Sequence, residues 1–166
     1  QKDIADIQFP EVDWDAGRIT RKRSKTRRYG NVPMVSYLLW PETLGLLRRE
    51  RSLAGSGRVL LNESGCPLWY EELGDDGRYK KNDNVRSAFE RLRRKLKINK
   101  SLVSLKKTSA SLIRGHKDYK GLEDLFLGHA PQKLSDRHYA KEPQNLLDEA
   151  ITWLREEYRI EDSGIV

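Results

Sequence analysis

Two side chains in the last third of the sequence could carry out nucleophilic chemistry on a phosphate. Tyr139 directly follows Arg137 and His138 and stands ten positions after His129. A phenol, with a pKa of about 10, attacks phosphorus well only when the phosphate is held in line and cations offset its negative charge. The flanking arginine and histidine could meet that condition. A single tyrosine more often packs half-buried against a helix end, and the chain has 7 tyrosines, so residue type alone leaves both interpretations open.

His129 follows Leu127 and Gly128 at the end of a predicted helix. The negative end of the helix dipole there favours an imidazolium. Such a histidine could donate a hydrogen bond to a non-bridging phosphate oxygen, or it could cap the helix without any functional role. The position of Tyr139 ten residues later favours the first interpretation.

Lysines occupy two places from which they could assist the same reaction. Lys25 lies at the predicted tip of a β-hairpin, and a flexible ammonium there can reach a leaving oxygen and protonate it. It could equally be a solvated turn lysine, no different from Lys22. Lys106 and Lys107 form a pair on a predicted helix, where their charge would attract a phosphate.

Basic residues are both abundant and clustered. The formal net charge is +7, and 32 of the 166 residues are Lys or Arg. Two blocks stand out besides the lysine pair: Arg21, Lys22, Arg23, Lys25, Arg27 and Arg28, and then Arg91, Arg93, Arg94, Lys95 and Lys97. Each could be a solvated face, but three clusters together favour a nucleic acid, bound with salt-dependent affinity through counterion release. Charge alone leaves RNA and acidic proteins open as partners.

Other classes of function fit the sequence poorly. No apolar run approaches the roughly 20 residues that span a bilayer, and no secretory signal is visible. The single cysteine, Cys66, suits a reducing cytoplasm. Three histidines at irregular spacing make no zinc pattern, and the acidic residues around Asp75 fit a solvated loop better than a magnesium site. We expect a cytoplasmic protein that needs neither a metal nor another cofactor.

The elements that must position these side chains follow from hydrophobic spacing and turn residues. A short helix is expected at 2–7, a β-hairpin with strands 18–22 and 32–38 around a turn at 24–30, and a helix from Pro41 onward. Further helices are expected at 84–96, 105–113, 121–127, 133–139 and 144–158, whereas 59–61 is β-like, 65–77 is a loop and 161–166 is a polar tail. The sequence predicts one domain over 1–160, mainly α-helical with a small antiparallel β-sheet near the N-terminus.

Apolar residues at helical spacing give three of these helices a face to bury. The face of the helix from Pro41 contains Leu44, Leu47 and Leu53. That of helix 84–96 contains Val85, Phe89, Leu92 and Leu96, and that of helix 144–158 contains Leu146, Leu147, Ala150, Ile151 and Leu154.

The stretch from Leu105 to Tyr139 resembles the C-terminal catalytic domain of tyrosine recombinases, the phage-integrase family, which break and rejoin DNA through a phosphotyrosine. The Leu-Gly-His run and the tyrosine ten positions later are the most specific points of resemblance. The family also has a lysine on a β-hairpin, often as Arg-x-Lys-Thr before a Val-Pro strand. Here the chain reads Arg23-Ser24-Lys25-Thr26, and Val32-Pro33 follow. The resemblance extends from Asp3 to the helix after Tyr139.

Two positions depart from the family pattern. Alignment on the family's His-x-x-Arg box puts Lys106 at the arginine, 23 positions before His129 as in the family, and Val103 at the histidine. Lysine cannot make the bidentate contact of arginine with a phosphate, and valine donates no hydrogen bond. Loss of one such donor typically slows a reaction by about 10²- to 10³-fold. A further family arginine would stand immediately before Gln1, so we expect the chain to be a fragment that lacks the family's N-terminal core-binding domain.

The resemblance also implies roles for single residues. Tyr139 would attack a scissile phosphate and form a 3′-phosphotyrosine, while Lys25 would protonate the 5′ leaving oxygen. His129 and Lys106 would stabilise the pentacoordinate phosphorus. The double-stranded DNA would be held by Arg23, Arg27, Arg28, Lys107 and Arg137. As in the family, we expect a homotetramer on DNA, a monomer when free, and a place in a bacterial cell, a phage or another mobile element.

Two alternatives remain open from the sequence. Val103 and Lys106 could mark a DNA-binding relic of the same fold that no longer cleaves. The chain could also be a nicking enzyme similar to type IB topoisomerases, which share this chemistry. The target site, and the choice between integration, excision and resolution, are not encoded in any recognisable motif.

Overall fold

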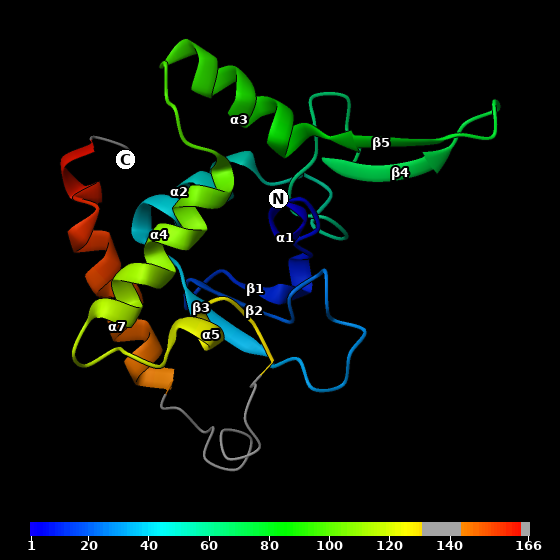
Figure 1. Cartoon of the computed structure of the whole chain (residues 1–166). Coiled ribbons are helices and arrows are strands. Elements are labelled where there is room, and N and C mark those ends of the chain that lie inside the picture. The colour runs from blue at the N-terminus through cyan, green and yellow to red at the C-terminus, as the bar shows by residue number, and fades with distance from the viewer. Residues whose placement is uncertain (131–143, 164–166) are drawn as a thin grey trace.

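The computed structural model describes residues 1–130 and 144–163, in which six α-helices and two short 3₁₀ helices accompany two small antiparallel sheets (Figure 1). The α-helices are α1 (Lys2–Ala5), α2 (Pro41–Glu50), α3 (Asn84–Lys95), α4 (Leu102–Gly115), α5 (Glu123–Phe126) and α7 (Gln144–Glu157). The 3₁₀ helices are η1 (Phe9–Glu11) and η2 (Ile160–Ser163). The strands are β1 (Val12–Asp13), β2 (Arg18–Arg21), β3 (Val35–Leu38), β4 (Trp69–Leu73) and β5 (Tyr79–Asp83). The chain is thus of mixed α and β class.

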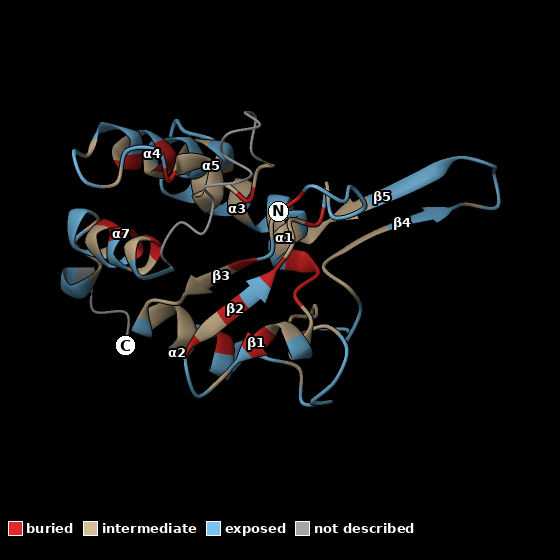
Figure 2. Cartoon of the chain, turned by 90° about the horizontal axis from the view of Figure 1, so that it is seen from below, coloured by how far each residue is buried: buried red, intermediate tan, exposed pale blue. Residues whose placement is uncertain are grey.

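A three-stranded antiparallel sheet in the order β1-β2-β3 lies at the centre of the molecule (Figure 2). Ile19 pairs with Tyr37, and Arg21 pairs with Val35. Because side chains alternate along a strand, Ile19 and Arg21 both point to the buried face of β2. The predicted hairpin is confirmed, but β3 begins at Val35 rather than at 32. The reason is that residues 26–32 form two successive turns, closed by backbone hydrogen bonds of 2.9 and 3.3 Å.

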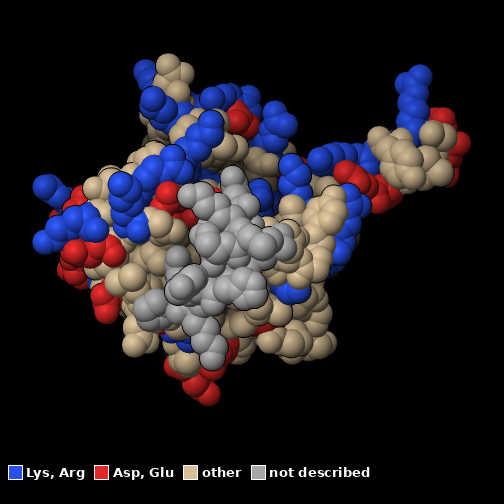
Figure 3. Space-filling view, turned by 60° about the horizontal axis from the view of Figure 1, so that its bottom comes forward, with Lys and Arg blue, Asp and Glu red and all other residues tan. Residues whose placement is uncertain are grey.

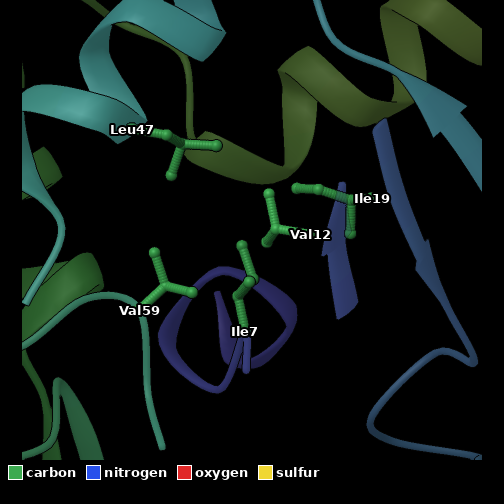
Figure 4. Close-up of a cluster of buried hydrophobic side chains, with 5 residues drawn as sticks. All are labelled: Ile7, Val12, Ile19, Leu47 and Val59. Carbon is green, nitrogen blue, oxygen red and sulfur yellow. The ribbon is translucent and has the colours of Figure 1, made fainter. Parts of the chain in front are cut away.

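One core cluster joins this sheet to α2 and to the segment that follows α1. Its buried members are Ile7, Val12, Ile19, Leu47 and Val59 (Figure 4). Helix α2 begins with Pro41 at its first position, directly after Trp40, as the sequence predicts. Burial of one such aliphatic side chain contributes about 1.5–3 kcal/mol, so the cluster holds the sheet on which the candidate site is built.

The C-terminal helix α7 buries the apolar stripe predicted for it. Leu147, Ala150, Ile151 and Leu154 are buried, in clusters that also include residues of β3, α4 and α5. The indole Nε1 of Trp40 donates to the carbonyl of Ile151 (2.8 Å), and Arg155 binds Glu42 at 2.6 Å. These bonds tie α7 to the start of α2 as well as to the sheet.

The prediction of a loop at 65–77 is wrong, because β4 lies within this range. β4 pairs with β5 along its whole length, and this hairpin projects from the rest of the molecule (Figures 1 and 2). The turn between the strands contains Gly77, whose φ of 70° lies in the left-handed region. Most of the hairpin is exposed, including the consecutive acids Glu71 and Glu72 of β4. Because the hairpin has no buried face, apolar and polar residues do not alternate along its strands, and hydrophobic periodicity does not indicate them.

Two further details differ around α2. Leu53 is fully exposed instead of completing the apolar face of the helix. The helix ends at Glu50, and the N–H of Ser52 bonds to the carbonyl of Val59 (2.7 Å), which turns the chain away. Residues 59–61 contribute a buried Val59 and one isolated bridge at Leu61, and they form no strand of either described sheet.

The remaining helices agree with the prediction in position more than in burial. Helix α3 spans nearly the predicted range, but none of its residues is buried, and Leu92 and Leu96 are exposed. Helix α4 begins at Leu102, before the predicted start, and α5 is shorter than predicted. Part of the expected polar tail forms η2. The helix predicted at 133–139 lies outside the described residues.

Candidate functional site

A pocket of about 370 Å³ opens between the loop 22–34 and the residues that follow α5. It is lined by Arg23, Thr26, Tyr29, Asn31, Val32, His129 and Ala130. Two of the predicted site residues, Arg23 and His129, therefore meet at one pocket although they lie far apart in the sequence. A guanidinium and an imidazole beside a pocket of this size suit an anionic ligand such as a phosphate.

The Leu-Gly-His run ends α5 with a Schellman motif. The N–H of Gly128 donates to the carbonyl of Leu125, and the N–H of His129 donates to the carbonyl of Asp124, both at 2.8 Å. Gly128 has a φ of 63°, a left-handed conformation that costs other L-residues about 1–2 kcal/mol. The order of glycine and then histidine thus places His129 directly beyond the end of the helix.

The imidazole of His129 is held by an acid of the same helix. Its Nδ1 lies 3.2 Å from Oδ1 of Asp124, and the side chain is 32% exposed. A carboxylate beside Nδ1 favours a proton on that nitrogen. In the imidazolium form Nε2 also carries a proton, which it can donate in a hydrogen bond to a ligand.

The absence of a side chain at Gly128 lets this turn pack closely on the sheet and the loop. A Cβ there would lie 3.2 Å from Oη of Tyr37 and 3.4 Å from Cβ of Arg23. Burial raises the pKa of Tyr37 to about 12, with Asp3 adding to the effect and Arg21 and Arg23 opposing it. A buried phenol that keeps its proton is a poor nucleophile, so Tyr37 acts as a packing surface for the turn.

Lys106 lies on α4 within electrostatic reach of the loop 22–34. Burial lowers its pKa, and the positive charges of Arg23 and Lys25 lower it further, while Asp3 opposes them. Because charge effects on a pKa weaken with distance and screening, Lys106 lies within electrostatic reach of Arg23, Lys25 and the acid Asp3. Val103, one turn earlier on α4, is 53% exposed and offers no hydrogen-bond donor.

The structure therefore brings together part of the predicted site. Arg23 and His129 line one pocket, and Lys25 and Lys106 contribute charge to the same region. The DNA-contact candidates Lys107, Arg27 and Arg28 are exposed. The expected nucleophile Tyr139 and its neighbour Arg137 lie outside the described residues.

Three polar residues that line the pocket were not predicted as site residues from the sequence: Thr26, Tyr29 and Asn31. Their hydroxyl and amide groups can form hydrogen bonds with phosphate oxygens. Oη of Tyr29 already accepts a hydrogen bond from Arg28 (3.0 Å). No spacing rule singles out these residues, and their one sequence signal is their place in a basic run between two predicted strands.

The start of α7, five positions after Tyr139, is fixed on the sheet. Arg18 donates to both carboxylate oxygens of Asp148, at 2.7 and 2.9 Å, and Gln144 donates to Asp148 and to the carbonyl of Ser36, both at 2.8 Å. Burial by itself would raise the pKa of Asp148, but these hydrogen bonds and the charge of Arg18 hold it below its ordinary value. The pair therefore stays ionised and anchors the helix.

Helix α3 presents a second basic surface. Its cationic residues are Arg86, Arg91, Arg93, Arg94 and Lys95, against the single acid Glu90. Lys and Arg side chains are numerous on the upper part of the face in Figure 3, and others stand beside acids on the projecting hairpin. Such an excess of one charge attracts polyanions.

Among the described residues, no α-helix combines the length and the apolar character needed to cross a bilayer. In the same residues, no group of three or more His, Cys, Asp or Glu side chains could hold a metal ion. Comparison with protein-family models, with curated proteins and with solved structures found no match for this chain.

Proposed function

We propose that this chain is the catalytic domain of a tyrosine recombinase, with the fold of that family, and that it cleaves and rejoins double-stranded DNA. The observation that supports the proposal best is the convergence of cationic groups from three separate segments. Arg23 and Lys25 belong to the loop 22–34, Lys106 to α4, and His129 to the turn after α5. A phosphodiester bound there would have its developing negative charge stabilised by preorganised donors.

In the proposed reaction, the phenol oxygen of Tyr139 attacks the scissile phosphorus. A bond forms between that oxygen and phosphorus, the bond from phosphorus to the 5′ oxygen breaks, and the phenol proton passes to water. Lys25 gives its proton to the 5′ oxygen, so the products are a 3′-phosphotyrosine and a 5′-hydroxyl. His129 and Lys106 stabilise the charge on the non-bridging oxygens. Attack by another 5′-hydroxyl reverses these steps and needs no external energy source.

The distribution of charge favours duplex DNA as the substrate. The loop 22–34 supplies Arg23, which lines the pocket, and the exposed Arg27 and Arg28, and α3 supplies a separate group of cations. Contacts of this kind with phosphates release counterions and give strong salt dependence. Assembly into a homotetramer on DNA, from monomers in solution, is part of the proposal.

A DNA-binding relic without cleavage activity is the second candidate. Lys106 stands where the family has an arginine, and the exposed side chain of Val103 stands where it has a histidine. The same pocket would then bind a backbone phosphate without breaking it. A nicking enzyme similar to type IB topoisomerases differs from the leading proposal in assembly rather than in this chemistry.

A nicked suicide duplex tests the proposal. Because the target sequence is unknown, a pool of duplexes with randomised sequence around the nick serves as substrate, and covalent protein–DNA adducts are detected on denaturing gels. The chain should form an adduct that Tyr139→Phe abolishes. Tyr29→Phe is the matched control, since it removes a phenolic hydroxyl that lines the pocket but is not the proposed nucleophile. This variant should still form the adduct, at most more slowly.

Other outcomes of the same experiment decide between the candidates. Salt-dependent binding without an adduct supports the relic. An adduct that disappears in Tyr29→Phe but persists in Tyr139→Phe contradicts the assignment of the nucleophile. The double substitution Val103→His and Lys106→Arg should raise cleavage, and an unchanged rate would mean that the alignment of that box is wrong.

A further inference from the structure

A buried polar network lies at the base of the loop 22–34. Asp6, Arg21 and Ser24 are 6%, 6% and 8% exposed, and they come from the end of α1, the end of β2 and the loop itself. Nη2 of Arg21 donates to Oδ1 of Asp6 and to Oγ of Ser24, and Oγ of Ser24 donates to the same Asp6 oxygen. Each of these distances is 2.7 Å. The three side chains thus form a closed triangle of hydrogen bonds.

Ser24 is held through its main chain as well. Its backbone N–H donates to Oδ1 of Asp3 at 2.7 Å, and Nη1 of Arg21 donates to the carbonyl of Asp3 at 2.7 Å. Burial by itself would raise the pKa of Asp3, but the hydrogen bonds from Ser24 and the charge of Arg21 lower it below its ordinary value. The acceptor therefore stays ionised, and α1 locks the position of Ser24.

Stability alone is a poor explanation of this network. A buried ion pair loses about as much in desolvation as it gains in attraction, and apolar replacements are often as stable. Among the described residues, Nε of Arg21 is buried without a hydrogen-bond partner, which adds a further penalty. The network makes more sense as a device that fixes one backbone position.

That backbone position lies between two residues of the candidate site. Arg23, on one side of Ser24, lines the pocket with His129, and Lys25, on the other side, has an exposed side chain. The N–H of Thr26 donates to the carbonyl of Arg23 (3.1 Å), which closes a turn with Ser24 and Lys25 at its centre. A lysine amine sits on a flexible four-carbon stem, so it reaches a defined point only if its backbone is fixed.

We propose that the Asp6–Arg21–Ser24 network is a positioning device that holds the Lys25 amine where it can protonate the 5′ leaving oxygen. The inference rests on the proposed function. When the bond from phosphorus to the 5′ oxygen breaks, its electron pair stays on the oxygen, which takes the proton of Lys25. In this proposal the network acts through the backbone of Ser24, whose N–H is held by Asp3.

The test compares two nicked duplexes that differ in one leaving atom, the natural 5′ oxygen or a sulfur in its place. A thiol has a pKa of about 8.5, far below that of an alcohol, so sulfur leaves with little need for a proton. Single-turnover rates are measured with both duplexes for the unsubstituted chain, Ser24→Ala, Lys25→Ala and Ser64→Ala. Ser64 is an exposed loop serine and serves as the matched control. The fraction of folded protein affects both rates equally, so their ratio is independent of stability.

General acid catalysis contributes about 10²- to 10⁴-fold, so Lys25→Ala should slow cleavage of the oxygen duplex by at least about 10²-fold and leave the sulfur duplex almost unaffected. We expect Ser24→Ala to change the oxygen-to-sulfur ratio in the same direction by about 10-fold. Ser24→Thr keeps the hydroxyl, so its oxygen-to-sulfur ratio should lie close to that of the unsubstituted chain. Asp6→Asn is the second variant and should act like Ser24→Ala.

Two kinds of failure are distinguishable. If Lys25→Ala changes the ratio but Ser24→Ala and Asp6→Asn match Ser64→Ala, or lower both rates equally, the positioning role is wrong and the proposed function stands. If the unsubstituted chain forms an adduct with neither duplex, the proposed function fails and the inference fails with it.

Discussion

Nδ1 of His129 lies 3.2 Å from Oδ1 of Asp124, and the backbone N–H of His129 donates to the carbonyl of the same Asp124 at 2.8 Å. One acid on α5 therefore sets both the position and the orientation of the imidazole. In the proposed reaction, Asp124 is thus a positioning residue that fixes where the other ring nitrogen, Nε2, can meet a phosphate oxygen.

Replacing Asp124 by Asn should weaken cleavage without weakening DNA binding. The variant offers Nδ1 of His129 a neutral and therefore weaker acceptor, so the imidazole is held less firmly. We expect single-turnover adduct formation to slow by about 10-fold or more, short of the roughly 10²-fold loss for a missing donor. Asp118→Asn removes a nearby exposed carboxylate and should leave the rate unchanged. Equal rates for the two variants would contradict the role of Asp124.

Gly128→Ala should destabilise the fold. The positive φ at this position and the contacts of a new Cβ with Tyr37 and Arg23 both oppose a side chain. We expect a loss of about 1–2 kcal/mol in the free energy of unfolding, measured by chemical denaturation. Gly45→Ala is the matched control, because Gly45 lies within α2 with open space around its Cβ position, and it should stabilise by about 0.5–1 kcal/mol. A stabilised Gly128→Ala variant would disprove the close packing of this turn.

Asp148 should make stability depend on acid pH. Its pKa in the folded chain lies below the ordinary value of 3.8, so its bonds with Arg18 and Gln144 contribute fully above that value. The contribution is lost as the pH falls through the folded-state pKa. Asp148→Asn should therefore lower the free energy of unfolding by about 1.5–3 kcal/mol near neutral pH. On acidification, the free energy of unfolding of this variant should fall less than that of the unsubstituted chain. Denaturation curves at several pH values measure both effects. The adjacent exposed Glu149→Gln should behave like the unsubstituted chain, and the same steep acid loss in Asp148→Asn would refute the assignment.

Reversing charge on α3 should weaken DNA binding and reduce the dependence of the affinity on salt concentration. The double variant Arg91→Glu and Arg94→Glu removes two exposed cations from the basic surface. Each phosphate contact that is lost should lower the slope of log affinity against log salt by about 0.9. Lys117→Glu, beyond the C-terminal end of α4, is the control and should change the slope much less. Titrations of a labelled duplex at several salt concentrations give the slopes, and a double variant with the slope of the control would rule out α3 as a DNA contact.

The sequence predicted those elements whose signals are local or periodic. The apolar stripe of α7, the start of α2 at Pro41 and the hairpin around Lys25 all appear where expected. The β4–β5 hairpin was missed because it buries no face of its own and therefore leaves no alternating pattern. The exposed position of Leu53 was missed for a related reason, since spacing cannot show where a helix stops against a neighbouring segment.

By itself, the sequence determined which groups are available: the basic blocks, the glycine that allows a helix to end before His129, and the lysine between two predicted strands. These depend on residue type and on a few neighbours. The tertiary structure decided that Arg23 and His129 line one pocket and that the charge of Lys25 lowers the pKa of Lys106. It also decided that the N–H of Ser24 bonds to Asp3 of α1. Such contacts join segments that are distant in the sequence and come from the packing of α4, α5 and the sheet, for which no local pattern exists.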